Sequence, residues 1–159
     1  MWGDADGATG GGISQFEAQP SYQVNNVNNL SSTKRTIPDV AAEADPETGV
    51  IVNDTFSVGG FFTVGGTSLA CPLWAGMVAV ADQGRVLAGL PTLDGPSQTL
   101  PTLYQLPSSD FHDITVGNNF TFSAMPGYDL VTGRGTPIAN LLVPALAGYG
   151  TVAPIVNAP

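Results

Sequence analysis

The sequence has little positive charge and almost no cysteine. Lys and Arg together number 4, against 13 Asp and Glu in 159 residues, and the formal net charge at pH 7 is −9. Because a phosphate-contacting surface needs clustered Lys and Arg, we expect no nucleic-acid partner. The single cysteine, Cys71, has no partner for an internal disulfide, so cysteine usage does not indicate a redox compartment.

Long apolar runs are also absent. No apolar stretch reaches the roughly 20 residues of a membrane-spanning helix, so we expect no membrane partner. The opening residues, "MWGDADGATGGG", have neither the basic segment nor the apolar segment of a signal peptide. With 43% hydrophobic and only 11% charged residues, the chain is expected to fold as one domain with an apolar core. The scarcity of Lys and Arg suits an acidic medium, because few cations repel one another once the carboxylates are protonated.

The pattern of apolar and turn-forming residues predicts strands followed by helices. Runs of β-branched and aromatic residues at 50–53 and 61–66 predict two strands, which can form a hairpin. An almost uniformly apolar run predicts a buried helix from Pro72 to Leu87. Further expectations are helices at 97–106 and 137–148, mostly loop before residue 35, and a long loop at 111–137. This order predicts an α/β fold with a partly parallel sheet.

One hydroxyl, that of Ser68, lies between a glycine pair and the predicted helix in "VGGTSLACPLWAG". Ser is a favoured N-cap residue and Pro a favoured early helix residue, so capping is one interpretation. The other is a nucleophile, since a serine at a helix N-terminus lies near backbone N–H groups that can stabilise an oxyanion. These residues alone leave both roles open.

The long loop contains two carboxylates, Asp113 and Asp129, and the turn-forming segment "AMPGYD". Pro126 and Gly127 can shape the backbone so that neighbouring carbonyls turn inward with Asp129. Hard cations such as Ca²⁺ accept six to eight carboxylate and carbonyl oxygens in irregular geometry. A cation site and a plain Asx-turn loop are both compatible with this pattern. His112 has no Cys or His neighbour in the sequence and is a poor zinc ligand candidate.

Five segments, taken together and in order, resemble the sedolisin family of serine-carboxyl peptidases. They are "GGGIS…PSYQ", "IPDVAAEADPETG", "VGGTSLACPLWAG", "LYQLPSSDFHDIT" and "PGYDLVTGRGTP", and they span about residues 10–147. The resemblance implies an α/β fold with a subtilisin-like parallel sheet and flanking helices. It further implies that residues 1–147 form the C-terminal portion of a peptidase domain and that residues 148–159 are a tail or linker.

The same resemblance assigns roles to individual residues. Ser68 matches the nucleophile that forms an acyl-enzyme during proteolysis by a serine-type endopeptidase. One Ca²⁺ ion is expected, with ligands that match the family's two carboxylates and three main-chain carbonyls: Asp113, Ile114, Met125, Gly127 and Asp129. Position 125 is usually Gly in relatives, but only its carbonyl is required. The implied partners are protein or peptide substrates, and the implied location of the parent protein is extracellular.

The family's other catalytic groups have no match in this chain. In sedolisins a Glu acts as general base toward the serine, an Asp orients that Glu, and a second, protonated Asp assists the oxyanion, which explains an acidic optimum. All three lie well upstream of the nucleophile, and only 67 residues precede Ser68 here. Asp39 matches a structural position of the family. No local acid falls in a matching catalytic motif: Asp4, Asp6, Glu17, Asp39, Glu43, Asp45, Glu47 and Asp54.

Three hypotheses follow. The first is a partial domain of an acid-acting endopeptidase that needs a missing N-terminal half of the same domain as its partner. The second is a non-catalytic, calcium-stabilised binding or structural module derived from that fold. The third is an unrelated hydrolase that uses Ser68 or Cys71 with His112, although Cys71 is more simply explained as a small buried helix residue.

Three tripeptides have the form of N-glycosylation acceptors: Asn29-Leu30-Ser31, Asn53-Asp54-Thr55 and Asn119-Phe120-Thr121. They have meaning only in a eukaryotic secretory pathway.

Overall fold

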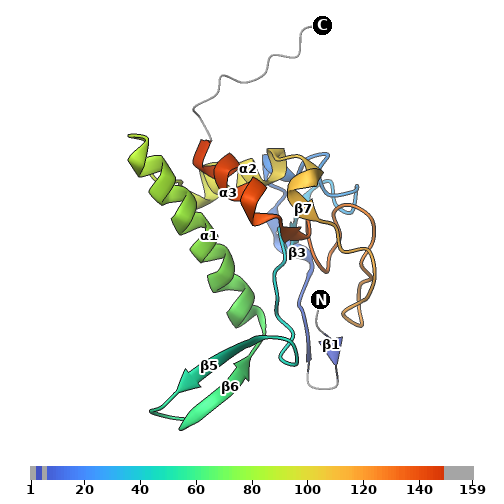
Figure 1. The fold of residues 1–159 in the computed structure, drawn as a ribbon. Coiled ribbons are helices and arrows are strands. Elements are labelled where there is room, and N and C mark those ends of the chain that lie inside the picture. Colours follow the sequence, from blue (N-terminus) through green and yellow to red (C-terminus); the bar gives the residue numbers. More distant parts are fainter. Residues whose placement is uncertain (1–2, 5–6, 149–159) are drawn as a thin grey trace, which may run out of the picture.

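Short strand pairs and helices alternate along the chain in the computed structural model, which describes residues 3–4 and 7–148 (Figure 1). The α-helices are α1 (Thr67–Leu87), α2 (Leu100–Gln105) and α3 (Ala139–Gly148). The 3₁₀ turns are η1 (Ser21–Gln23) and η3 (Ser108–Asp110), and η2 (Gly95–Thr99) is a π-helical turn. The strands are β1 (Gly3–Asp4), β2 (Gly7–Ala8), β3 (Gly12–Ala18), β4 (Lys34–Ile37), β5 (Val50–Asp54), β6 (Gly60–Val64), β7 (Phe111–His112) and β8 (Thr136–Pro137).

All strand pairs of the described residues are antiparallel and two-stranded: β1 with β2, β3 with β4, β5 with β6, and β7 with β8. The predicted hairpin is confirmed, with Val50 opposite Val64 and Asp54 opposite Gly60. Only residues 55–59 join these two strands, and a parallel pair needs a crossover of a dozen or more residues. The hairpin is thus necessarily antiparallel. The other strand pairs of the described residues are antiparallel too, so the expected parallel sheet is not formed within these residues. Strand β3 lies in a region where the sequence predicted mostly loop.

Helix α1 begins at Thr67, five residues earlier than predicted, with Gly66 as its N-cap residue. Gly66 has a φ of 80°, a left-handed conformation that suits glycine. A Cβ atom at Gly65 would lie 2.5 Å from the backbone of Pro46, so only glycine fits there. Pro72 lies inside the helix and lacks an N–H, so it cannot donate to the Ser68 carbonyl one turn earlier. The glycine pair thus turns the chain directly from β6 into α1.

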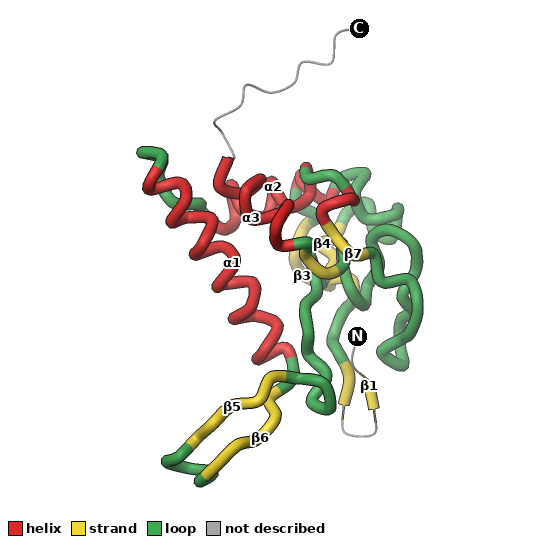
Figure 2. The backbone as a smooth tube through the Cα atoms, viewed as in Figure 1, coloured by secondary structure: helices red, strands yellow, loops and turns green. Residues whose placement is uncertain are grey.

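The main apolar core lies between α1 and α3, which pack along each other (Figure 2). Its buried members are Ala81, Leu103, Phe111, Leu142 and Leu146. The prediction of a buried α1 holds for one face only. Several apolar side chains on α1 are exposed, from 40% at Leu73 to 83% at Leu87, with Val80 and Val86 between. Cys71, expected to be buried, is also exposed, because it lies near the start of α1 away from the core.

Within the described residues no helix has both the length and the apolar character needed to cross a membrane. The predicted boundary between a domain ending at 147 and a tail at 148–159 falls at the end of α3, which includes Gly148. Residues 149–159 lie outside the described residues, so this boundary stays a prediction.

Candidate active site and cation-binding loop

Ser68 is the second residue of α1 and is exposed to solvent. Among the described residues, its hydroxyl has no hydrogen-bond partner, and the backbone N–H groups of Thr67 and Ser68 donate to no acceptor. The first N–H groups of a helix lack intrahelical partners and favour negative charge. The hydroxyl and two free donors therefore share one helix end. Gly66, rather than Ser68, is the N-cap residue, and no side chain caps this helix.

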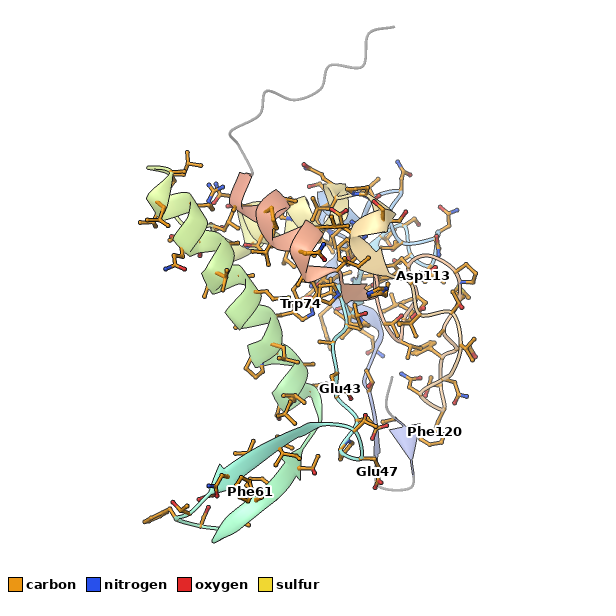
Figure 3. The ribbon with its side chains drawn as sticks, viewed as in Figure 1. Glu43, Glu47, Phe61, Trp74, Asp113 and Phe120 are labelled. Carbon is orange, nitrogen blue, oxygen red and sulfur yellow. The ribbon has the colours of Figure 1, made fainter. Side chains whose placement is uncertain are left out.

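Two cavities lie beside the first turn of α1, and Thr67 and Ala70 line both of them. The first, of about 100 Å³, is closed on its other sides by Val40, Ile114 and Val131 among others. The segment after β4 forms a shared wall, and the Trp74 indole holds it by donating to the Ala41 carbonyl at 2.9 Å. Trp74 lies on the side of α1 that faces the rest of the molecule (Figure 3). The first turn of α1, which contains Ser68, is thus packed against this wall.

The acidic side chains near the hairpin accept hydrogen bonds from residues close to them in the sequence. Glu43 Oε1 accepts from the Asp45 N–H at 2.7 Å and from the Thr48 hydroxyl at 3.2 Å. Asp54 accepts from Ser57, and these hydrogen bonds hold the pKa of the Asp54 carboxyl below its usual value. No carboxylate of the described residues forms a hydrogen bond with the Ser68 hydroxyl. The general base that the resemblance requires has no counterpart among them.

A Ser or Cys nucleophile paired with His112 receives no support from the geometry. His112 lies in β7 opposite Thr136 and is exposed. Within the part of the chain that the structure describes, no hydrogen bond joins His112 to Ser68 or Cys71. An imidazole acting as a base must lie within hydrogen-bond reach of the nucleophile, directly or through one water.

The two aspartates of the long loop both bind its backbone, at different depths. The exposed Asp113 accepts from the Gly127 N–H at 2.9 Å through Oδ2. Asp129 is 1% exposed and accepts from the Met125 N–H at 3.1 Å through Oδ2. Its Oδ1 atom accepts from the N–H groups of Val131 and Thr132 at 2.8 and 2.7 Å. Asp129 therefore also closes the tight turn that follows it, as the Asx-turn interpretation expected.

Some carbonyls of this loop accept hydrogen bonds and others do not. Those of Pro126 and Tyr128 accept from the Asn28 amide at 3.1 and 2.7 Å. Among the described residues, the carbonyls of Ile114, Met125 and Gly127 accept no hydrogen bond. These three are the carbonyls that the resemblance assigns to the metal, and oxygen atoms without a protein donor are free to bind a cation.

The proposed ligand atoms are all oxygens, which suits a hard cation. The five residues that carry them do not all line one cavity. Asp113 and Gly127 line one cavity, Met125 and Asp129 line another, and Ile114 lines the cavity beside α1. No three His, Cys, Asp or Glu side chains of the described residues cluster as a metal site. The proposed ligand set has only two such side chains, and its other oxygens are main-chain carbonyls. Oxygen ligands without sulfur or imidazole fit Ca²⁺.

A buried polar cluster around Asp39 was not predicted beyond the structural role of that residue. Gln23 is fully buried and donates through Nε2 to the Thr36 carbonyl at 2.8 Å and to the Tyr104 hydroxyl at 3.0 Å. Tyr104 in turn donates to Asp39 Oδ1 at 2.9 Å. The Arg35 guanidinium binds Asp39 Oδ2 at 2.5 Å. Asp39 is therefore fixed in a structural role and is unavailable as a catalytic base.

Two tyrosines of this region titrate far from their usual range. Burial raises the pKa of the Tyr128 hydroxyl to about 12, and burial raises the pKa of the Tyr104 hydroxyl still further. Tyr128 donates to the Thr36 hydroxyl at 2.8 Å or to the Pro38 carbonyl at 2.9 Å. The sequence signal for this cluster was weak, because its residues are spread from position 22 to 128.

Known proteins resemble most of this chain. Kumamolisin of a Bacillus species is 40% identical over 92% of the chain, and the match covers 27% of that protein. Sedolisin of a Pseudomonas species is 32% identical over 81% of the chain and 21% of its own length. Tripeptidyl-peptidase 1 of the dog is 30% identical over 89% of the chain and 28% of its own length. No protein-family model matches.

The fold agrees with these relatives. A structure of Pseudomonas sedolisin, described as a serine-carboxyl proteinase in complex with two molecules of pseudo-iodotyrostatin, matches with a TM-score of 0.74 at 28% identity. The match covers 93% of this chain and 40% of the sedolisin chain. The class of protein is thus that of a partial α/β domain of subtilisin-like fold, as predicted. The chain belongs to the sedolisin family. It spans about a quarter of the length of the curated relatives.

Proposed function

We propose that this chain is part of an acid-acting serine-type peptidase in which Ser68 attacks the substrate carbonyl and forms an acyl-enzyme. The observation that carries the proposal is the exposed hydroxyl at the start of α1, next to two backbone N–H groups without acceptors. A nucleophile and oxyanion donors at one helix end are the arrangement that acyl transfer requires. The relatives named as peptidases support the same chemistry.

The proposed activity requires groups that the described residues do not provide. A serine hydroxyl is a weak nucleophile until a base removes its proton. We infer that the Glu base, its Asp partner and the oxyanion Asp belong to a further part of the same domain, which is the partner that this chain needs. Endopeptidase action on proteins or peptides is the proposed specificity. Tripeptidyl-peptidase 1 is named for release of tripeptides, so cleavage within a chain and cleavage at its end are the two outcomes to separate.

We also propose one Ca²⁺ ion in the long loop, held by the carboxylates of Asp113 and Asp129 and by the carbonyls of Ile114, Met125 and Gly127. The three carbonyls without hydrogen-bond donors support this assignment. The ion would draw the segments 113–114 and 125–129 together and so stabilise the loop. Its role here is structural, and no step of the reaction passes through it. For the parent protein we propose an extracellular location, in line with the acidic composition and the resemblance.

A non-catalytic calcium-stabilised module is the second candidate. The observation that favours it is the lack of a carboxylate bonded to the Ser68 hydroxyl within the described residues. Such a module would keep the loop and the fold while losing the base.

The test uses the whole polypeptide that the gene encodes, assayed at pH 3 to 5 against internally quenched peptides with free and with blocked N-termini. Cleavage of both substrates that Ser68→Ala abolishes, with the exposed Ser32→Ala as the active control, is the expected result. Cleavage of the free-ended peptides alone would replace the endopeptidase assignment with an exopeptidase. A folded polypeptide without any cleavage would favour the non-catalytic module.

A further inference from the structure

Two of the three glycosylation tripeptides, those of Asn119 and Asn53, lie in opposite surroundings. Asn119 is 8% exposed, and its Nδ2 atom donates to the Thr9 carbonyl at 2.8 Å. Its Oδ1 atom accepts from the N–H groups of Thr121 and Phe122 at 3.2 and 2.8 Å. A sugar on Nδ2 would occupy the space between this amide and Thr9. A chain modified at Asn119 therefore cannot close this loop around the amide.

Asn53 is in the opposite situation. It lies in β5 of the hairpin, is exposed, and its side chain forms no hydrogen bond with any described residue. The hydroxyl of Thr55, which completes the tripeptide, lies in the exposed turn that follows β5. The hairpin projects away from the helical body of the molecule (Figure 1). A large substituent on Asn53 has room there.

The strand pairing gives Asn53 a specific neighbour. Phe61 of β6 is the Cα partner of Asn53, so the two side chains project from the same face of the hairpin about 5 Å apart at Cβ. Phe61 is 75% exposed, and Ile51, two residues before Asn53 on the same face, is 74% exposed. Figure 3 shows Phe61 on the hairpin, away from the helices. An exposed apolar face of this kind on a two-stranded ribbon favours self-association.

We propose that Asn53 is an N-glycan acceptor when the protein passes through a eukaryotic secretory pathway, and that the first sugar packs on Phe61. The Asn53 Nδ2 atom attacks the anomeric carbon of an oligosaccharide carried on a polyprenyl diphosphate. The N–C bond forms as the C–O bond to the diphosphate breaks, one amide proton is lost, and the polyprenyl diphosphate leaves. The apolar face of the sugar ring then covers the Phe61 ring, which shields the hairpin from other copies.

The experiment expresses the whole encoded polypeptide as a secreted Ser68→Ala variant in yeast, so that self-digestion cannot obscure the result. Peptide N-glycosidase treatment in H₂¹⁸O marks each formerly occupied Asn as a heavy Asp, which mass spectrometry then locates. We expect heavy Asp at position 53 in most molecules and none at position 119. Thr55→Ala should abolish the label at 53. Secreted, folded protein that is unlabelled at 53, or labelled at 119, would overturn the proposal.

A second measurement tests the packing on Phe61. Light scattering near pH 4 compares the glycosylated protein with the same protein after glycan removal. Removal should accelerate aggregation of the parent protein and have little effect on a Phe61→Ala variant, which lacks the ring that the sugar covers. Phe61 is mostly exposed, so this substitution leaves folding intact. An equal acceleration in both proteins would refute the contact between the sugar and Phe61.

Discussion

Tyr104 of α2 donates a hydrogen bond to the Asp39 carboxylate, 65 positions earlier in the sequence, at 2.9 Å. Arg35 binds the other oxygen of the same carboxylate, so Asp39 connects α2 to the end of β4. These contacts anchor α2 to the segment after β4, which forms the cavity wall beside Ser68.

We expect Tyr104→Phe to lower the free energy of unfolding by about 1–2 kcal/mol, because it removes a donor to a partly buried carboxylate and an acceptor for Gln23. Chemical denaturation of the whole polypeptide at pH 7 measures the loss. In a double-mutant cycle, Asp39→Asn and Tyr104→Phe should cost less together than the sum of their separate effects. Additive effects would contradict a shared hydrogen bond. Asp94→Asn, at a fully exposed turn, serves as the control.

The buried tyrosines predict a loss of stability in alkali. Burial raises the pKa of Tyr128 from its usual value of about 10 to about 12, so its contribution to stability is complete below about pH 10 and is lost as the pH rises through about 12. In this window the unfolded chain releases the proton that the folded protein retains. The stability of the wild type should therefore fall with pH more steeply than that of Tyr128→Phe, by about 1.4 kcal/mol per pH unit. Urea denaturation at several pH values within this window measures both slopes. Equal slopes would mean that Tyr128 ionises normally.

The sequence predicted the hairpin, the long loop and the C-terminal helix from local patterns alone. These elements depend on neighbouring residues, such as the β-branched runs on either side of residues 55–59 and the Gly and Asn residues of the loop. The start of α1 was placed late because Pro72 favours an early helix position, while the glycine pair and the contact of Gly65 with Pro46 set the actual start. A contact between two residues about twenty positions apart produces no periodic pattern in the sequence, so the helix start could not be predicted from it.

Burial was the less predictable property. An apolar run such as Leu73 to Leu87 indicates a helix, but not which of its faces another segment covers. The polar cluster around Asp39 was missed for the same reason, because Gln23 and Tyr104 meet only in the folded chain. The candidate site itself depended on the resemblance. Ser68 is confirmed as an exposed residue of a helix start, while its catalytic role and the metal ligands stay predictions.

The calcium proposal predicts that a chelator lowers the melting temperature of the whole polypeptide. Ca²⁺ at a hundredfold excess over its Kd adds about 3 kcal/mol to the stability of a protein that binds it only when folded. Asp113→Asn should remove most of this effect while keeping an oxygen acceptor for the Gly127 N–H. Asp113 is the better test residue, because Asp129 also holds the Val131 and Thr132 amides and its loss would disturb the turn directly.

The control for the calcium experiment is Asp94→Asn, since Asp94 is exposed and binds only its own turn. A chelator shift of equal size in wild type and Asp113→Asn would contradict the assignment of the ion to this loop. Mg²⁺ should not replace Ca²⁺, because it demands near-octahedral geometry and retains its waters.

The last prediction concerns the 159-residue chain produced by itself. The exposed apolar face of α1, with Val80, Val86 and Leu87, lacks a covering layer among the described residues. A helix that is apolar on nearly every side is stable only when both faces are covered, so we expect this chain alone to self-associate and to melt without a sharp transition. It should also fail to cleave peptides at pH 3 to 5, because no carboxylate of the described residues forms a hydrogen bond with the Ser68 hydroxyl. Calorimetry and size-exclusion chromatography test the first expectation, and a peptide library tests the second. A monomer with a cooperative melt would favour the self-sufficient module, and turnover abolished by Ser68→Ala would mean that a carboxylate of this chain acts as the base.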